Sequence, residues 1–176
     1  MNINSNTSIC MQAKNLYHTS FPKEERLPFW VMRALALKKG IDFTCYYDEN
    51  EFCGFTYTAS KGNILFVLFF AVETSLRQNG YGSAILQYIK EQNPDKTIVL
   101  NVELLDPRAD NYEERVKRFA FYKKNGFYDT GYDIEEVGGV FRVLSTSPIL
   151  DTVAYSRVFK KMSFGLWNPK IMRVEE

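Results

Sequence analysis

A nine-residue apolar run, Ile64–Val72, limits the fold of this chain more than any other segment. A membrane-spanning helix needs about 20 apolar residues, so the run is too short to cross a bilayer. It is predicted to be a central strand covered on both faces. A polar stretch follows, and Gly80-Tyr81-Gly82 then begins an amphipathic helix, Tyr81–Gln92. The chain therefore passes from a buried strand through a polar loop into a glycine-bearing helix start.

The other elements predict a mixed α/β layer structure. Residues Met1–Asn6 are expected to fray at the end of the chain. The predicted strands are Ile41–Tyr47, Phe52–Ala59, Thr97–Leu104, Phe127–Glu135 and Val140–Ser145. The predicted helices are Pro22–Lys39, Glu113–Lys124 and a last one capped by Asp151 and running towards Met162.

Length and composition predict one soluble domain over residues 1–176. A net charge of +1 gives no electrostatic grip on nucleic acid or on a membrane surface. The three cysteines, Cys10, Cys45 and Cys53, lack metal-ligand spacing, so no metal site is predicted. Their odd number and the lack of a signal peptide favour reduced thiols and a cytoplasmic location.

The glycine-bearing helix start has the chemistry of a pyrophosphate cradle. Free backbone N–H groups at a helix start favour an anion, and glycines let a phosphate approach the backbone closely. Arg77 adds a fixed positive charge at the same place. The simpler interpretation is a solvated loop before a glycine-rich helix start.

Two other phosphate-binding patterns fit poorly. A P-loop needs Lys followed by Ser or Thr after its last glycine, and Ser83-Ala84 stands there instead. A dinucleotide fingerprint would use Glu103 on the ribose, but Ile85 occupies the place of its third glycine. A nucleotide-dependent oxidoreductase or a methyltransferase is therefore a distant alternative.

Two segments resemble the Gcn5-related N-acetyltransferase (GNAT) superfamily. Arg77-Gln78-Asn79-Gly80-Tyr81-Gly82 looks like its Arg/Gln-x-x-Gly-x-Gly/Ala signature. Phe121-Tyr122-Lys123-Lys124-Asn125-Gly126-Phe127 is similar to its helix followed by Gly-Phe. The resemblance covers Ile41 to Phe127 well and both ends poorly, so residues 151–176 are treated as a C-terminal extension. It implies the acyl-CoA N-acyltransferase fold, a mostly antiparallel central sheet that is splayed between two central strands and flanked by helices.

The resemblance also implies where acetyl-CoA, the co-substrate, would bind. Backbone groups of Ala71 and Val72 would pair with the pantetheine arm as an added strand does. The pyrophosphate would be held by the amides of Arg77, Gln78, Asn79, Gly80, Tyr81, Gly82 and Ser83. The thioester would lie between the two splayed strands.

Tyr122 matches the tyrosine that protonates the leaving thiolate in many members of the superfamily. A tyrosine that only packs on its helix is the simpler interpretation. Glu103 is the predicted general base, with Glu73 or a chain of waters as alternatives, because the glutamate that some members carry on the fourth strand is absent here. Arg115 stands where many relatives have an asparagine. It and Arg118 are predicted to face solvent or to contact the CoA phosphates.

The resemblance therefore implies an acyltransferase that moves an acetyl group directly to an amine of a small molecule or a peptide. The rival interpretation is a non-catalytic acyl-CoA-binding module on the same fold. The acceptor, the acyl chain length and the formation of a homodimer are left open by the sequence.

Overall fold

The computed structural model describes residues 1–7, 10–136 and 139–174 and contains two compact units. Unit 1 comprises Met1–Ser60 and Val67–Asp95, and unit 2 comprises Lys61–Phe66 and Lys96–Glu176. Strand β4 (Ile64–Val72), which the sequence predicted with these bounds, begins in unit 2 and ends in unit 1. The organisation as a single domain stays a prediction.

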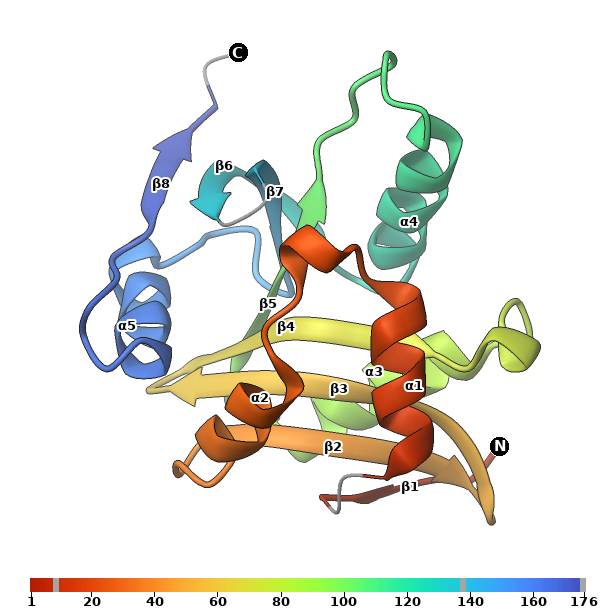
Figure 1. Ribbon diagram of the computed structural model, residues 1–176. Helices are drawn as coiled ribbons and strands as arrows, with labels where there is room; N and C mark the ends of the chain where they lie inside the picture. Colours follow the sequence, from red (N-terminus) through yellow and green to blue (C-terminus); the bar gives the residue numbers. More distant parts are fainter. Residues whose placement is uncertain (8–9, 137–138, 175–176) are drawn as a thin grey trace. The chain divides into compact units, whose positions relative to one another are not determined.

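Unit 1 is built on the strand order β1-β2-β3-β4, with helices on its strands (Figure 1). Strands β1 and β2 pair in antiparallel fashion, as do β2 and β3, which form a hairpin from two of the predicted strands. The register places Phe43 opposite Tyr57 and Cys45 opposite Phe55. The elements are β1 (Ile3–Asn6), α1 (Met11–Ser20), the short 3-10 helix η1 (Lys23–Glu25), α2 (Phe29–Leu35), β2 (Ile41–Asp48), β3 (Glu51–Lys61), the 3-10 helix η2 (Thr74–Leu76) and α3 (Tyr81–Gln92).

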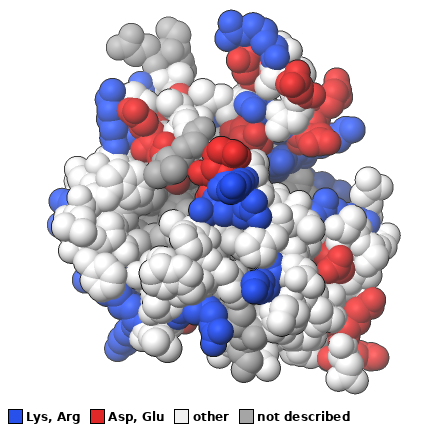
Figure 2. Space-filling view, in the orientation of Figure 1, with Lys and Arg blue, Asp and Glu red and all other residues white. Residues whose placement is uncertain are grey.

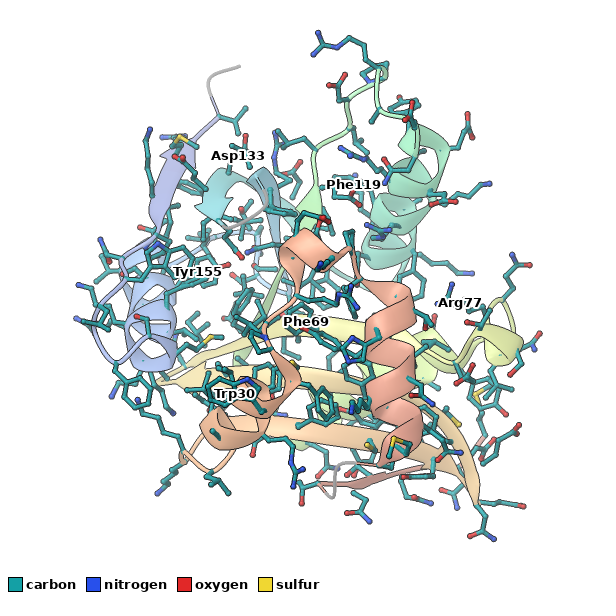
Figure 3. All side chains as sticks on the ribbon, viewed as in Figure 1. Trp30, Phe69, Arg77, Phe119, Asp133 and Tyr155 are labelled. Carbon is teal, nitrogen blue, oxygen red and sulfur yellow. The ribbon has the colours of Figure 1, made fainter. Side chains whose placement is uncertain are left out.

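Aromatic rings fill the face of unit 1 that α1 covers. Tyr17 of α1 is fully buried, and its ring centroid lies 5.1 Å from that of Phe69 and 6.2 Å from that of Phe55. Phe43 stacks on Phe55 at 5.0 Å. Figure 3 labels Phe69 within this cluster on β4. Each buried aromatic side chain contributes about 1.5–3 kcal/mol to stability, so this cluster stabilises the part of β4 that belongs to unit 1.

Helix α3 packs on the opposite face of the unit 1 strands. Tyr88 of α3 meets Tyr46 of β2 edge to face, with the ring centroids 5.9 Å apart. The Tyr46 hydroxyl shares a buried 2.9 Å hydrogen bond with the Thr56 hydroxyl. Burial of Ile85 and of its neighbours on the same side of the helix confirms the predicted apolar face. The middle of α3 is thereby held against the strands of unit 1.

Unit 2 has the strand order β5-β7-β6-β8, and all three of these pairs are antiparallel. Asp151 caps α5 as predicted, accepting a 2.8 Å hydrogen bond from the Ala154 N–H. Tyr155 and Phe159 of α5 pack on Phe66, with ring centroids 5.5 Å and 5.0 Å away. The elements are β5 (Thr97–Glu103), α4 (Tyr112–Lys124), β6 (Tyr128–Glu136), β7 (Gly139–Ser145), α5 (Thr152–Met162) and β8 (Lys170–Arg173).

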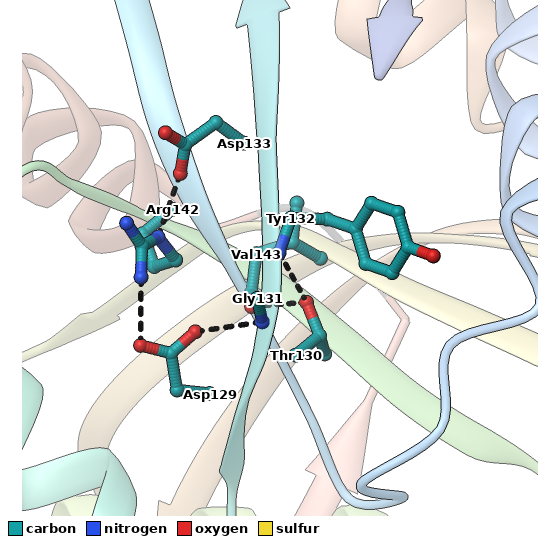
Figure 4. Close-up of polar contacts among 7 residues, drawn as sticks. All are labelled: Asp129, Thr130, Gly131, Tyr132, Asp133, Arg142 and Val143. Carbon is teal, nitrogen blue, oxygen red and sulfur yellow. Dashed lines mark hydrogen bonds and ion pairs between the residues drawn. The ribbon is translucent and has the colours of Figure 1, made fainter. Parts of the chain in front are cut away.

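A guanidinium bridges the irregular part of β6, where the register with β7 shifts between Asp129 and Asp133 (Figure 4). Arg142 of β7 donates from Nε to Asp133 at 2.6 Å and from Nη1 to Asp129 at 2.8 Å. Gly131 lies between them with φ +71°, a conformation that glycine adopts without a steric penalty. The two ion pairs therefore stabilise the bulged strand on both sides of the irregularity.

The N-terminal quarter of the chain differs from the prediction. The predicted helix Pro22–Lys39 is wrong in extent, since only Phe29–Leu35 forms an α-helix and Pro28 precedes it as N-cap. Proline restricts the residue before it and cannot donate a backbone hydrogen bond, so a helix cannot run through this position unbroken. Residues Ile3–Asn6, expected to fray, form the edge strand β1 through backbone pairing.

Replacing Gly54 with alanine is expected to destabilise the protein by about 1–3 kcal/mol. A Cβ at Gly54 would lie 2.3 Å from the Ala71 carbonyl oxygen, so β3 and β4 would have to move apart. Gly62→Ala is the control, because its Cβ would meet nothing and costs only the left-handed backbone penalty, about 1 kcal/mol. Urea unfolding measures both values, and equal losses would contradict the close approach of the strands.

Candidate active site

The loop between β4 and α3 presents an unbroken series of main-chain donors. Among the residues that the structure describes, none accepts a hydrogen bond from the N–H groups of Gln78 through Ser83. The first amide inside α3 that is paired belongs to Ala84, which donates to the Gly80 carbonyl at 3.0 Å. Gln78, Asn79 and Gly80 are exposed and Tyr81, Gly82 and Ser83 are half-buried, so at least the first three donors are open to solvent or to an anion.

The backbone of this loop includes two residues in the left-handed conformation. Gln78 has φ +65° and Gly80, the N-cap of α3, has φ +87°, both in the left-handed region. Glycine pays no steric penalty there, whereas Gln78 does. Successive N–H groups in such a turn form a concave anion site. The strained Gln78 is the part of this loop that the sequence did not predict.

Arg77 lies just beyond the end of β4 (Figure 3). Its Nε donates to the Val72 carbonyl at 3.2 Å, and Nη2 donates to the Ser20 hydroxyl at 3.4 Å. The guanidinium is exposed and keeps donors available for a phosphate. The same contact occupies the carbonyl of Val72, one of the two residues predicted to pair with the pantetheine arm.

Tyr81 fixes the first turn of α3. Its hydroxyl donates to Asp48 Oδ2 at 3.1 Å, at the end of β2. This hydrogen bond to a carboxylate raises the pKa of Tyr81. The pKa of Asp48 is lowered chiefly by the hydrogen bond from the Asn2 amide and, to a smaller extent, by the one from Tyr81. The helix start therefore keeps a defined position on the β2 strand although its own amides have no partner.

Tyr122 lies on α4 in unit 2 and is 9% exposed. Burial raises its pKa to about 12, against a smaller opposite effect of the Arg118 charge. The rings of Phe121 and Phe127 pack against it at 5.2 Å and 5.7 Å. The phenol is therefore protonated across the physiological pH range, as a proton donor must be.

The carboxylate of Glu103 is enclosed by donors from α4 and the residue before it. Asn111 donates to Oε1 at 3.1 Å, Arg115 lies 3.2 Å from the same oxygen, and Arg118 pairs with Oε2. The Arg115 guanidinium also donates to the Asn111 side chain at 2.6 Å and to the Leu104 carbonyl at 2.9 Å. The sequence predicted that Arg115 and Arg118 face solvent or contact the CoA phosphates. In the structure both guanidinium groups contact the Glu103 carboxylate.

Asn111, Arg115, Arg118 and Tyr122 follow one another at helical spacing on one side of α4. Figure 2 shows charged side chains of both signs gathered over α4 and the loop before it. The contact of Asn111 with Glu103 was not predicted. The sequence indicates only that Asn111 is a residue type that is common at the N-cap of a helix. Glu73, the alternative base, accepts a 2.7 Å hydrogen bond from the Thr74 N–H and so caps η2.

The predicted site residues thus fall into two groups. Ala71, Val72 and the segment from Arg77 to Ser83 lie in unit 1, whereas Glu103 and Tyr122 lie in unit 2. Within the described part of the chain, no cluster of His, Cys, Asp or Glu could hold a metal ion. No helix in that part is long and apolar enough to cross a membrane.

Comparison with known families places the site in context. The family model for the acetyltransferase (GNAT) domain matches residues 39–129, more than half of the chain. The chain belongs to the GNAT acetyltransferase family. This match includes the cradle, Glu103 and Tyr122. As a member of this family the protein is an acyl-CoA-dependent N-acetyltransferase. A comparison with curated protein sequences found no match.

Solved structures share the GNAT fold over most of the chain. A protein assigned to the GNAT family from Bacteroides thetaiotaomicron is 21% identical, with a TM-score of 0.72 over 95% of this chain and 100% of its own. An aminoglycoside 6′-N-acetyltransferase complexed with coenzyme A is 18% identical, with a TM-score of 0.64 over 85% of this chain and 98% of its own. Naa50 of Arabidopsis thaliana, in complex with a bisubstrate analogue, is 22% identical, with a TM-score of 0.58 over 84% and 99%.

These likenesses confirm the predicted fold class. Strands paired in antiparallel order and flanked by helices make up both units, as the GNAT resemblance implied. The predicted splaying would separate β4 from β5. The later residues of β4, from Val67 on, belong to unit 1, whereas all of β5 belongs to unit 2. The splaying stays a prediction.

Replacing Glu103 with glutamine is expected to lower the free energy of unfolding by about 1–3 kcal/mol, because two guanidinium groups lose their common anion. The side chains of Glu103 and Arg115 are 19% and 21% exposed, so water replaces the lost contacts poorly. Asp106→Asn is the control: its partner Arg108 is 90% exposed, and such pairs contribute less than about 1 kcal/mol. Chemical denaturation compares the two, and equal losses would show that the Glu103 contacts are not a stabilising network.

Proposed function

We propose that this protein transfers an acetyl group from acetyl-CoA directly to a primary amine of a small molecule or a peptide. The observation that carries the proposal is the series of open N–H donors from Gln78 to Ser83, with Arg77 beside it. Six amides and a guanidinium suit the two charges of a pyrophosphate better than they suit a neutral ligand. A helix start of this kind also leaves the phosphate accessible from solvent.

The pantetheine arm would pair with the backbone of Ala71 and Val72. The Val72 carbonyl accepts a hydrogen bond from Arg77 at 3.2 Å. A carbonyl oxygen has two lone pairs, so it can also accept a hydrogen bond from the arm. The other donors of the Arg77 guanidinium would bind the pyrophosphate, because a phosphate is a strong acceptor for a guanidinium.

Tyr122 would supply the proton for the leaving group. The amine nitrogen attacks the thioester carbonyl carbon, the C–S bond breaks, and the sulfur takes the proton of the phenol. A pKa of about 12 keeps that proton in place until negative charge develops on the sulfur. Arg118, one helical turn away, would ease the charge left on the phenolate by its positive field.

The proton that the attacking amine loses needs an acceptor. Glu103 remains the proposed base, and its ion pairs with Arg115 and Arg118 are the contacts that must open for it to accept a proton. A chain of waters is the alternative that the sequence gave.

The acceptor class rests on likeness alone. One similar structure is named for an aminoglycoside acceptor, and another carries a bisubstrate analogue with a peptide part. Acceptor loops vary freely on a common fold, so neither acceptor is transferred to this chain by the shared architecture. A small-molecule or peptide amine is the class common to both. Cytoplasmic location and a homodimer stay predictions.

Gly80→Ala is expected to weaken acetyl-CoA binding at least about tenfold, because a side chain disfavours the left-handed backbone that presents the donors. Isothermal titration of wild type and variant measures the dissociation constants. Gly62→Ala, which has a similar φ of +59° away from the cradle, should bind as wild type does. Unchanged affinity in Gly80→Ala, or no affinity of the wild type for any CoA ester, would overturn the cradle.

Tyr122→Phe is expected to lower kcat on the order of 100-fold while leaving the dissociation constant for acetyl-CoA unchanged. Because burial raises the pKa of Tyr122 to about 12, the wild-type rate should show no alkaline loss from this group below about pH 10. Thiol release with a panel of amines under chemistry-limited conditions measures both. The control is Tyr128→Phe, at a position that is 51% exposed. Full turnover by Tyr122→Phe would remove the proton-donor role.

A further inference from the structure

Two thiols of unit 1 are in contact although 35 positions separate them in the sequence. The sulfur atoms of Cys10 and Cys45 lie 3.6 Å apart. A disulfide bond is about 2.05 Å long, so the two atoms are at van der Waals contact and must approach by little more than 1.5 Å to be joined. Both residues are free cysteines in this structure.

The two cysteines differ in how far they can move. Cys45 is fully buried in β2, where it pairs with Asn6 of β1 on one side and Phe55 of β3 on the other. Cys10 stands outside the first turn of α1 as its N-cap, with an extended backbone. The approach can therefore be made by Cys10 without disturbing the strand register.

The two thiols also differ in chemical surroundings. Burial raises the pKa of Cys45 to about 12, so this thiol keeps its proton. Cys10 is half-buried, and the Ala13 N–H at the start of α1 points at its sulfur from 3.4 Å. An N–H donor at a helix start stabilises the negative charge that a sulfur carries when it attacks. Cys10 is thus the thiol that meets a reagent from solvent first.

We propose that Cys10 and Cys45 form a reversible disulfide bond when the protein meets an oxidising small disulfide such as oxidised glutathione. The Cys10 thiolate attacks one sulfur of the reagent, a mixed disulfide forms, and the first reduced glutathione leaves. Cys45 then loses its proton, attacks the Cys10 sulfur and releases the second glutathione. Two protein thiols are oxidised, and one glutathione disulfide is reduced to two thiols.

Cys53 provides an internal comparison. It is buried in β3 and its thiol donates to the Glu51 carbonyl at 3.3 Å. No contact between Cys53 and another cysteine is found among the described residues. The same oxidant should therefore leave Cys53 as a thiol.

The bond would join the start of α1 to β2. Helix α1 carries Leu16 and Tyr17 onto the aromatic face, so its attachment supports the cluster that holds β4. A cross-link over a loop of this length restricts the unfolded chain, and we expect the midpoint of thermal unfolding to rise by roughly 5–10 °C. The proposal does not depend on acetyl transfer.

The test incubates the full-length protein with graded ratios of reduced to oxidised glutathione and then blocks the remaining thiols. Peptide mapping by mass spectrometry under non-reducing conditions should find a Cys10–Cys45 link, the loss of two hydrogen atoms from the intact mass, and full reversal by dithiothreitol. Thermal unfolding of the oxidised protein gives the stability change. Cys53→Ser should behave as wild type does in all these measurements.

Cys10→Ser should abolish the link and the thermal shift. The fold should be kept, because the serine hydroxyl can replace the Cys10 sulfur as the acceptor for the Ala13 N–H at the helix cap. Cys45→Ala should abolish the link as well, leaving glutathione on Cys10. The proposal is overturned if wild type ends as a stable glutathione adduct with Cys45 still free, if Cys53 is the linked partner, or if all three thiols survive excess oxidised glutathione.

Discussion

Open main-chain donors at the start of α3 set the conditions for the rest of unit 1. A backbone N–H without an acceptor is costly when buried, so the segment from Gln78 to Ser83 has to stay at the surface. The loop nevertheless keeps its shape, because Tyr81 is bonded to Asp48 and α3 is packed by Tyr88 on β2. An exposed series of N–H donors on a firmly held helix start follows from these two requirements together. The aromatic cluster that packs on Phe69 likewise holds in position the strand that leads into the loop.

The polar side chains of α4 and of its N-cap contact Glu103, one of the two residues that were predicted to be catalytic. Glu103 was expected to be an available carboxylate at a strand end, yet it is a common acceptor for Asn111, Arg115 and Arg118. Its charge therefore orders the guanidinium groups that lie next to Tyr122 on the same side of the helix. The electrostatic surroundings of the phenol are set by these groups and by burial together. The structure thus links the two predicted residues through a third, Arg118.

Much of this architecture follows from sequence periodicity. The bounds of β4 and α3 were predicted because apolar runs and helical spacing are local signals, and Asp151 was predicted to cap α5 for the same reason. Helix α1 was missed, since Cys10 is an unusual cap and the charges that mark helix ends are few there. Strand β1 was missed because its side chains are mostly exposed and its pairing uses only the backbone. The surroundings of Glu103 and the contact of Cys10 with Cys45 depend on segments far apart in the chain, which local patterns do not report.

The division of β4 between the units has a consequence for biosynthesis. The ribosome completes every residue of unit 1 once Asp95 is made, and unit 2 then still lacks all but its first short stretch. That stretch contains Phe66, on which Tyr155 and Phe159 later pack. In the emerging chain the start of β4, with Phe66, is therefore made long before Tyr155 and Phe159, the residues that pack on it. During this interval Phe66 lacks the aromatic side chains that cover it in the folded protein.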